Sequence, residues 1–143
     1  MNRKLLKQDS GVIIVEIAVI LPFLILLILG IWDLGLMAHE HQVLQNAARE
    51  GARFSAQHRI GDHGVTLAAI QNRVVTYCSL QNITIQQNDV TVEQAFEYSL
   101  GTTTIQASEV IITRSRALLT PGMAQLLGQT VTVRGRGVFS NFY

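Results

Sequence analysis

One apolar segment constrains this chain more than any other feature of its sequence. From Val12 to Trp32 there are twenty-one residues, and Glu16 is the only charged residue among them. As an α-helix this run would be about 31 Å long, which matches the thickness of the hydrocarbon core of a bilayer. The run therefore predicts a membrane-spanning helix, and we expect the transmembrane segment to cover residues 12–37.

The acid inside this run has two interpretations. A carboxylate within a membrane costs on the order of a few kcal/mol, so Glu16 either reaches toward the lipid headgroups or has a partner in another molecule. The residues before the run include Arg3, Lys4 and Lys7. A short basic segment of this kind favours a cytoplasmic N-terminus, with the rest of the chain on the far side of the membrane.

The small residue Gly11 lies before the apolar run. Ordinary secretory signals carry their small residues after the apolar region. Cleavage at that point removes the apolar region from the mature protein. A cut after Gly11 would instead leave the membrane helix on the mature chain, with Val12 as the new terminus and Glu16 as the fifth residue.

This arrangement resembles the leader of type IV prepilins, in the form found in Flp-type pilins and pseudopilins. That pattern is a glycine, the cut, four residues, a glutamate and commonly a tyrosine, for which this chain has Ile17. The resemblance implies a leader at residues 1–11, removed between Gly11 and Val12 by a prepilin peptidase. It also implies that Glu16 acts in peptidase recognition or assembly, where the new α-amino group of one subunit neutralises Glu16 of a neighbour.

A second motif strengthens the resemblance. Residues 43–53 read Val-Leu-Gln-Asn-Ala-Ala-Arg-Glu-Gly-Ala-Arg, and a proline, Pro22, follows the acid by six positions. Together with Val-Glu-Ile-Ala at residues 15–18, this is similar to the TadE-like pseudopilins of the tight adherence (Tad) system. The similarity is dense over residues 11–56.

The resemblance carries expectations about function. It implies a minor pilin or pseudopilin that initiates or caps Flp pili rather than forming their bulk, in a system of secretion and adhesion. The expected partners are the prepilin peptidase, a TadF-like pseudopilin, the major Flp pilin and the inner-membrane platform of the Tad machinery. The expected location is the bacterial inner membrane, with a single span, a periplasmic head and incorporation into the surface pilus. The alternative is an uncleaved single-pass protein whose exposed domain binds an envelope partner or ligand.

Composition limits the other possibilities. A chain of 143 residues has room for one domain and a membrane anchor. Its formal net charge is +1, and removal of residues 1–11 would leave eight basic and nine acidic residues. A nearly neutral chain without a basic patch argues against nucleic acid as a partner. The single cysteine, Cys78, excludes an internal disulfide; we expect a buried thiol, with a bridge to a partner as the alternative.

The apolar helix is expected to continue beyond the membrane into the head, over residues 38–58. Small side chains recur there at helical spacing, which predicts one face that lets another element approach closely. This face packs either in the core of the head or between subunits, and Pro22 is expected to bend the helix within the membrane. The face consists of Leu44, Ala47, Ala48, Gly51, Ala52 and Ser55.

The remainder predicts a second helix and a small antiparallel sheet. Residues 59–64 suggest a turn, with Asp62 as the N-cap of a helix over 65–80. Alternating apolar residues then predict strands at 83–85, 90–100, 105–112 and 131–136, with a tight turn at Asn88-Asp89 and a basic outer face on the last strand. Thr120-Pro121-Gly122 predicts a short helix that ends at Gly128. The fold class is thus α+β, and the resemblance implies that it is pilin-like, with a head over residues 38–143.

No catalytic or metal-binding pattern is apparent in the sequence. His39 and His41 are two residues apart on a helix and point in different directions, while His58 and His63 have no neighbouring cluster of ligands. Neither a nucleophile elbow nor a phosphate-binding loop occurs. We therefore expect no enzyme activity, no cofactor and no metal.

Overall fold

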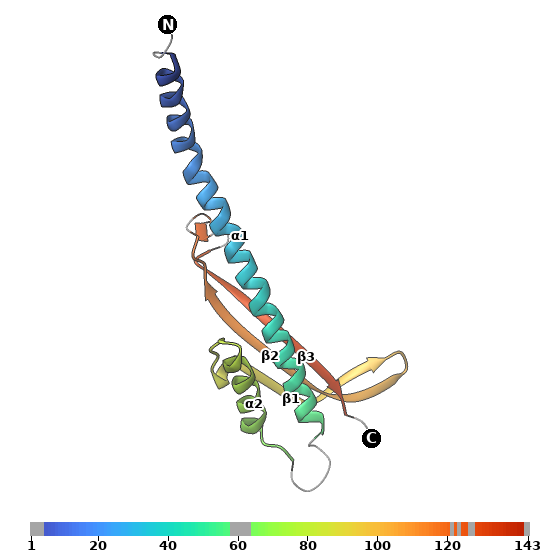
Figure 1. Cartoon of the computed structure of the whole chain (residues 1–143). Helices are drawn as coiled ribbons and strands as arrows, with labels where there is room; N and C mark the ends of the chain where they lie inside the picture. The colour runs from blue at the N-terminus through green and yellow to red at the C-terminus, as the bar shows by residue number, and fades with distance from the viewer. Residues whose placement is uncertain (1–4, 58–63, 121, 123, 126–127, 142–143) are drawn as a thin grey trace. The chain divides into compact units, whose positions relative to one another are not determined.

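The computed structural model describes residues 5–57, 64–120, 122, 124–125 and 128–141. Within these residues the chain forms two α-helices, one 3₁₀ helix and three strands (Figure 1). Their order along the sequence is α1 (Leu5–Gln57), α2 (Leu67–Leu80), η1 (Gln87–Asp89), β1 (Val90–Leu100), β2 (Thr103–Ala117) and β3 (Thr130–Ser140). This confirms the α+β, pilin-like layout expected from the sequence.

Helix α1 joins the apolar run and the small-residue segment in one continuous element. It begins at Leu5, seven residues before the start expected at Val12, and it continues through Gly11 without interruption. Pro22 lies inside the helix without ending it. The missing N–H of a proline removes only one hydrogen bond, which a long helix tolerates.

Helix α2 begins and ends with side-chain and backbone caps. Its N-cap is Thr66, whose hydroxyl accepts a hydrogen bond from the Ala69 N–H, so the prediction of Asp62 as the cap is wrong; Asp62 itself lies outside the described residues. At the other end Asn82 has a φ of 58°, and the N–H of Ile83 donates to the Cys78 carbonyl at 3.0 Å. This is a Schellman motif, with Asn in the left-handed position.

The same cap explains why the strand expected at residues 83–85 does not form. Because the Ile83 N–H is bonded to the end of α2, it is not available to a sheet ladder. Ile83 and Ile85 are nevertheless buried, as their alternation predicts. The turn expected at Asn88-Asp89 is the 3₁₀ helix η1, in which the Gln86 N–H donates to the Asp89 carboxylate at 2.8 Å.

The three strands form one sheet in the order β1-β2-β3. Strands β1 and β2 are an antiparallel hairpin closed by a turn in which Gly101 has a φ of 64°. Its register pairs Val90 with Ile112 and Phe96 with Ala107, and it shifts by one residue between Glu93 and Phe96. That shift is a β-bulge, which re-aims the strand beyond it, and the outer half of the hairpin extends away from the helices (Figure 1). The sequence predicts the second strand of this hairpin at residues 105–112, and β2 extends beyond both ends of that range.

The segment between β2 and β3 contains a helical turn. The Ala124 N–H donates to the Thr120 carbonyl at 2.9 Å, as expected for a helix that begins at Thr120; Pro121 lies outside the described residues. Strand β3 then follows the predicted alternation, with Arg134 and Arg136 on the outer face and Val133 on the buried one.

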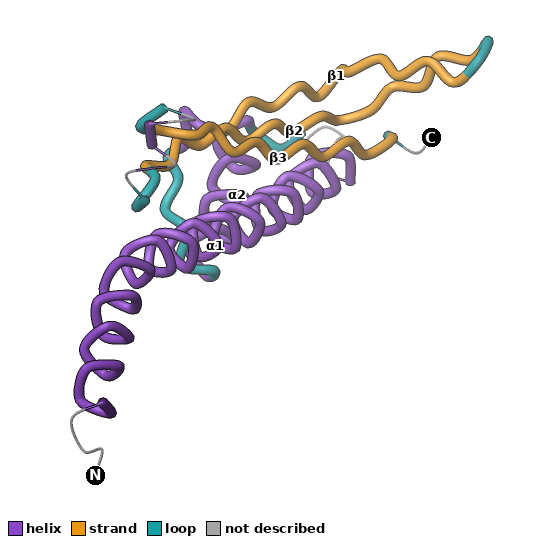
Figure 2. Tube along the Cα trace, turned by 90° about the horizontal axis from the view of Figure 1, so that it is seen from above, coloured by secondary structure: helices purple, strands orange, loops and turns teal. Residues whose placement is uncertain are grey.

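The core of the head lies between the sheet and the second half of α1. Figure 2 shows the strands as one layer and α1 as the other, and α2 contacts β1 and η1. The small-residue face of α1 is closed off completely: Leu44, Ala47, Ala48 and Ala52 have no exposed surface. The other members of the core are Val43, Ile70, Val74, Cys78, Ile83, Ile85, Val90, Val110, Ile112 and Val133.

Two glycines of β3 allow this close packing. A Cβ atom on Gly135 would lie 2.4 Å from the backbone of Leu44, and one on Gly137 would lie 2.4 Å from the backbone of Ala48. Both distances are far below van der Waals contact, so strand and helix meet backbone to backbone. The sequence pattern predicted the small face of the helix but not the role of these glycines.

The chain divides into two compact units. One consists of Met1–Leu36 with Ala117–Thr130, and the other of Met37–Arg116 with Val131–Tyr143. The first unit contains the apolar part of α1 and the β2–β3 connection. The second contains the core described above.

Candidate functional site

The apolar half of α1 exposes large hydrophobic side chains. Those between Val12 and Trp32 keep between 41% and 70% of their surface accessible, which is the reverse of a soluble core. Within the part of the chain that the structure describes, α1 is the one helix long and apolar enough to cross a membrane, and its most apolar stretch has no buried residues. The chain thus fits a single-pass membrane protein.

Gly11, Val12 and Glu16 lie on this exposed surface. A Cβ atom on Gly11 would meet nothing within 4 Å, so this chain has no packing reason of its own for a glycine there. Glu16 is exposed, and no described residue forms an ion pair or hydrogen bond with it. A carboxylate without a partner on an apolar helix needs one from outside the chain, or the water and headgroups at the edge of the bilayer.

The residues expected at helix or subunit contacts lie elsewhere. Ala47, Ala48, Gly51 and Ala52 pack inside this chain's own head, where a Cβ on Gly51 would lie 2.5 Å from a methyl group of Val74. Pro22 lies in the exposed apolar half. A role for these residues between subunits stays a prediction.

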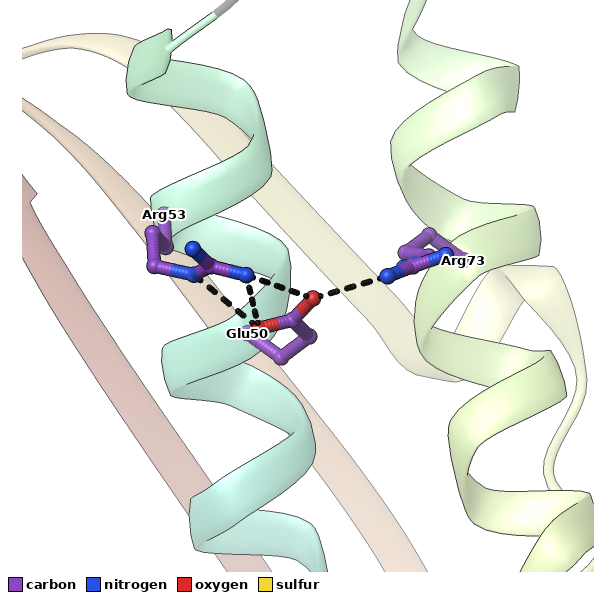
Figure 3. A network of polar contacts seen from close by, with 3 residues as sticks. All are labelled: Glu50, Arg53 and Arg73. Atoms are coloured by element: carbon purple, nitrogen blue, oxygen red, sulfur yellow. Dashed lines mark hydrogen bonds and ion pairs between the residues drawn. The ribbon is translucent and has the colours of Figure 1, made fainter.

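An ion-pair network joins α1 to α2 through the Arg-Glu-Gly-Ala-Arg motif. Glu50 accepts hydrogen bonds from Arg53, one turn further along α1, and from Arg73 of α2, with N–O distances of 3.0 to 3.2 Å (Figure 3). Burial raises the pKa of the Glu50 carboxyl, but the hydrogen bonds from Arg73 and Arg53 outweigh this effect and hold it below its ordinary value. The Arg73 guanidinium also lies 5.8 Å from the centre of the Phe54 ring. Through Glu50, the motif therefore links α2 to α1.

A second cluster joins α1 to the central strand. Glu40 is 8% exposed and pairs with Arg116 at 2.8 Å and with Arg114 at 3.2 Å. The other Glu40 oxygen and the Arg116 Nε are buried without a hydrogen-bond partner. Because 74 residues separate Glu40 from Arg114, nothing in the local sequence pattern indicated this pairing.

Polar contacts also link β3 to α1 and to β2. The side-chain amide of Gln45 donates to the Arg136 carbonyl at 2.6 Å and accepts from the Arg136 N–H at 3.1 Å. The Arg136 side chain pairs with Glu109 on β2 and lies over the Phe96 ring. Gln45 thus satisfies a backbone donor and acceptor of a strand beside the two glycines.

Asp33 is a buried acid of the first unit. Asp33 has no exposed surface, and its carboxylate accepts hydrogen bonds from the Thr120 hydroxyl at 2.6 Å, the Thr120 N–H at 2.8 Å and the Leu119 N–H at 3.3 Å. The Thr120 hydroxyl thus donates to Asp33, although Thr120 is also the residue at which the sequence predicts a short helix to begin. This contact joins the end of the apolar run to the β2–β3 connection.

Among the described residues, the cysteine and the two histidines show no reactive arrangement. Cys78 is buried in the core, and burial raises the pKa of its thiol to about 11 against the opposing effect of the Arg114 charge. His39 and His41 are exposed, and the described residues contain no group of three metal-ligating side chains. His58 and His63 lie outside the described residues.

Comparisons with known proteins give one informative match. No curated protein and no solved structure matches the chain. The segment from Gly11 through Arg53, which carries both the exposed apolar half of α1 and the Glu50 network, matches the model of the family described as "TadE-like protein", in agreement with the resemblance found in the sequence.

Proposed function

We propose that this chain is a minor pilin or pseudopilin of a Tad type IV pilus, which is cleaved after Gly11 and assembles through its N-terminal helix. The observation that carries the proposal is the match of residues 11–53 to the TadE-like family, which begins at the proposed cleavage site. In this proposal the chain initiates or caps the pilus. Its partners are a prepilin peptidase, a TadF-like pseudopilin, the major Flp pilin and the platform in the inner membrane, with the head on the periplasmic side.

The burial pattern of α1 supports an assembly role. Large apolar side chains remain exposed over its first half, so their contacts must come from lipid or from other helices. The second half of α1 packs in the core of the head. A helix with this division offers one surface for assembly and another for carrying a folded domain.

Cleavage is tested with two glycine variants of the same helix. Gly11→Leu should leave full-length precursor in membranes of cells that contain the peptidase, whereas Gly30→Leu should be processed normally. A Cβ meets nothing within 4 Å at either position, so the two substitutions are matched in their effect on this chain. Intact mass and N-terminal sequencing measure the outcome. Wild-type protein that retains Met1 in such cells would contradict the proposal and favour the uncleaved single-pass protein that binds an envelope partner.

The role of Glu16 is tested by Glu16→Gln, which keeps the shape of the side chain and removes its charge. We expect this variant to insert and to be cleaved, because a neutral residue costs less in the bilayer. It should fail to support pili and should not co-purify with partner pilins, because the α-amino group of a neighbour would lose its counter-ion. Normal filaments from Glu16→Gln would rule out charge pairing.

A further inference from the structure

The β2–β3 connection differs in composition from the head that surrounds it in the sequence. Residues 117–130 contain no charged side chain, and their large apolar residues are Leu118, Leu119, Met123, Leu126 and Leu127. Among those whose side chains are described, Leu119 keeps 66% of its surface exposed. A single exposed leucine is ordinary on a protein surface, and it is the position of Leu119 along α1 that distinguishes it.

The structure fixes where this segment lies along α1. Asp33, the residue directly after the apolar run, accepts three hydrogen bonds from Leu119 and Thr120. A hydrogen bond from the Leu118 N–H to the Gln129 carbonyl, at 3.3 Å, joins the two ends of the segment. The segment and the helix up to Leu36 form one compact unit. Leu119 is therefore held at the level of residue 33.

That level is where the membrane surface should be. Trp32 ends the apolar run and is 63% exposed, and tryptophan is enriched at the boundary between hydrocarbon and headgroups. Asp33 would be costly at this depth if it faced lipid, but its side chain is fully buried and accepts hydrogen bonds from Leu119 and Thr120. The apolar surface of the helix thus continues onto the exposed apolar surface of the segment.

We propose that the described residues at the start of this connection, 117–120, form an interfacial anchor, which places Leu119 in the lipid leaflet on the side of the head and is positioned there by Asp33. The inference rests on the membrane span of the proposed function and goes beyond it, since it adds a second contact with lipid. Shallow insertion of apolar side chains at the headgroup boundary is sufficient for such a contact.

The experiment uses the full-length chain in vesicles of phosphatidylcholine and phosphatidylglycerol, with or without bromine on the acyl chains. Trp32 is the only tryptophan, so Trp32→Phe gives a silent background for Leu119→Trp. Leu80→Trp is the matched control, because Leu80 is also a highly exposed leucine, at 75% against 66% for Leu119, at the end of α2 in the other unit. Both positions are open to solvent, so neither substitution disturbs packing.

We expect the tryptophan at 119 to emit at shorter wavelength, to lose intensity in brominated vesicles and to be poorly quenched by acrylamide. The control at position 80 should show the opposite on all three readouts. Equal acrylamide quenching at both positions, without a brominated-lipid effect at 119, would overturn the proposal and leave the segment to a protein partner. Wild-type Trp32 separates this failure from failure of the membrane span, since a spanning helix requires brominated lipid to quench Trp32.

Asp33→Ala tests the positioning role in the same background. Loss of the carboxylate removes all three hydrogen bonds to the segment, so quenching of the tryptophan at 119 by brominated lipid should decrease while acrylamide quenching increases. Unchanged quenching in Asp33→Ala would show that Asp33 does not position the anchor.

Discussion

The two halves of α1 have the same secondary structure and opposite environments. Between Val12 and Trp32 the side chains are large and stay exposed, whereas between Leu44 and Ser55 the inward face is made of small residues and is fully buried. The difference shows that hydrophobicity does not decide which half enters the core. Small side chains admit a neighbouring backbone, as at Gly135 and Gly137. The large side chains of the first half stay exposed among the described residues, so they are free to contact lipid or another molecule.

The largest effect should come from placing one methyl group between β3 and α1. Gly137→Ala puts a Cβ 2.4 Å from the backbone of Ala48, and backbone cannot move aside as a flexible side chain can. We expect a loss of more than about 4 kcal/mol, at the extreme of single substitutions. Pulse proteolysis of the full-length chain in urea and mild detergent measures it. Gly30→Ala in the exposed half should have no such effect; equal stability of the two variants would show that strand and helix are not in close contact.

A matched pair of isoleucines compares the core with the exposed half directly. Ile112 has no exposed surface, whereas Ile20 is 54% exposed. Ile112→Ala should destabilise the head by about 3 kcal/mol, from lost burial and the cavity left behind. Ile20→Ala should change the unfolding of the head by less than about 0.5 kcal/mol. The same urea titration checks both, and a large effect of Ile20→Ala on the isolated protein would mean that the apolar half packs within the chain.

The smallest effect concerns the link between α1 and α2, and it should depend on pH. The folded pKa of Glu50 lies below its ordinary value of 4.5. Its contribution is therefore fully present above pH 4.5 and is lost as pH falls through the lower folded value. Glu50→Gln should cost about 1 kcal/mol at neutral pH, because the pairs are partly exposed.

The difference between wild type and Glu50→Gln should shrink as the solution is acidified below pH 4.5. Glu97→Gln, at an exposed position on β1, is the control and should leave both stability and its pH dependence nearly unchanged. A constant difference between wild type and Glu50→Gln at all pH values would show that packing, rather than charge, accounts for the effect.

The sequence by itself determined the features that depend on local pattern. An uninterrupted apolar run specifies a long exposed helix, and residues spaced by three and four positions specify which face of its second half is buried. The alternation in β3 and the end of α2 at Leu80 were likewise predictable, because neighbouring residues supply the signal. Alternation at Ile83 and Ile85 predicted burial correctly and a strand wrongly, since inward-facing side chains do not require a ladder partner.

Only the tertiary structure decided what meets across long separations. Asp33 binds Thr120 and Glu40 binds two arginines of β2, pairings more than seventy residues apart that no local spacing encodes. Gly135 and Gly137 look like interruptions of a strand in the sequence, and their reason appears only when the backbone of α1 lies against them. Close packing is a property of two surfaces, so each sequence segment carries only half of the information that specifies it.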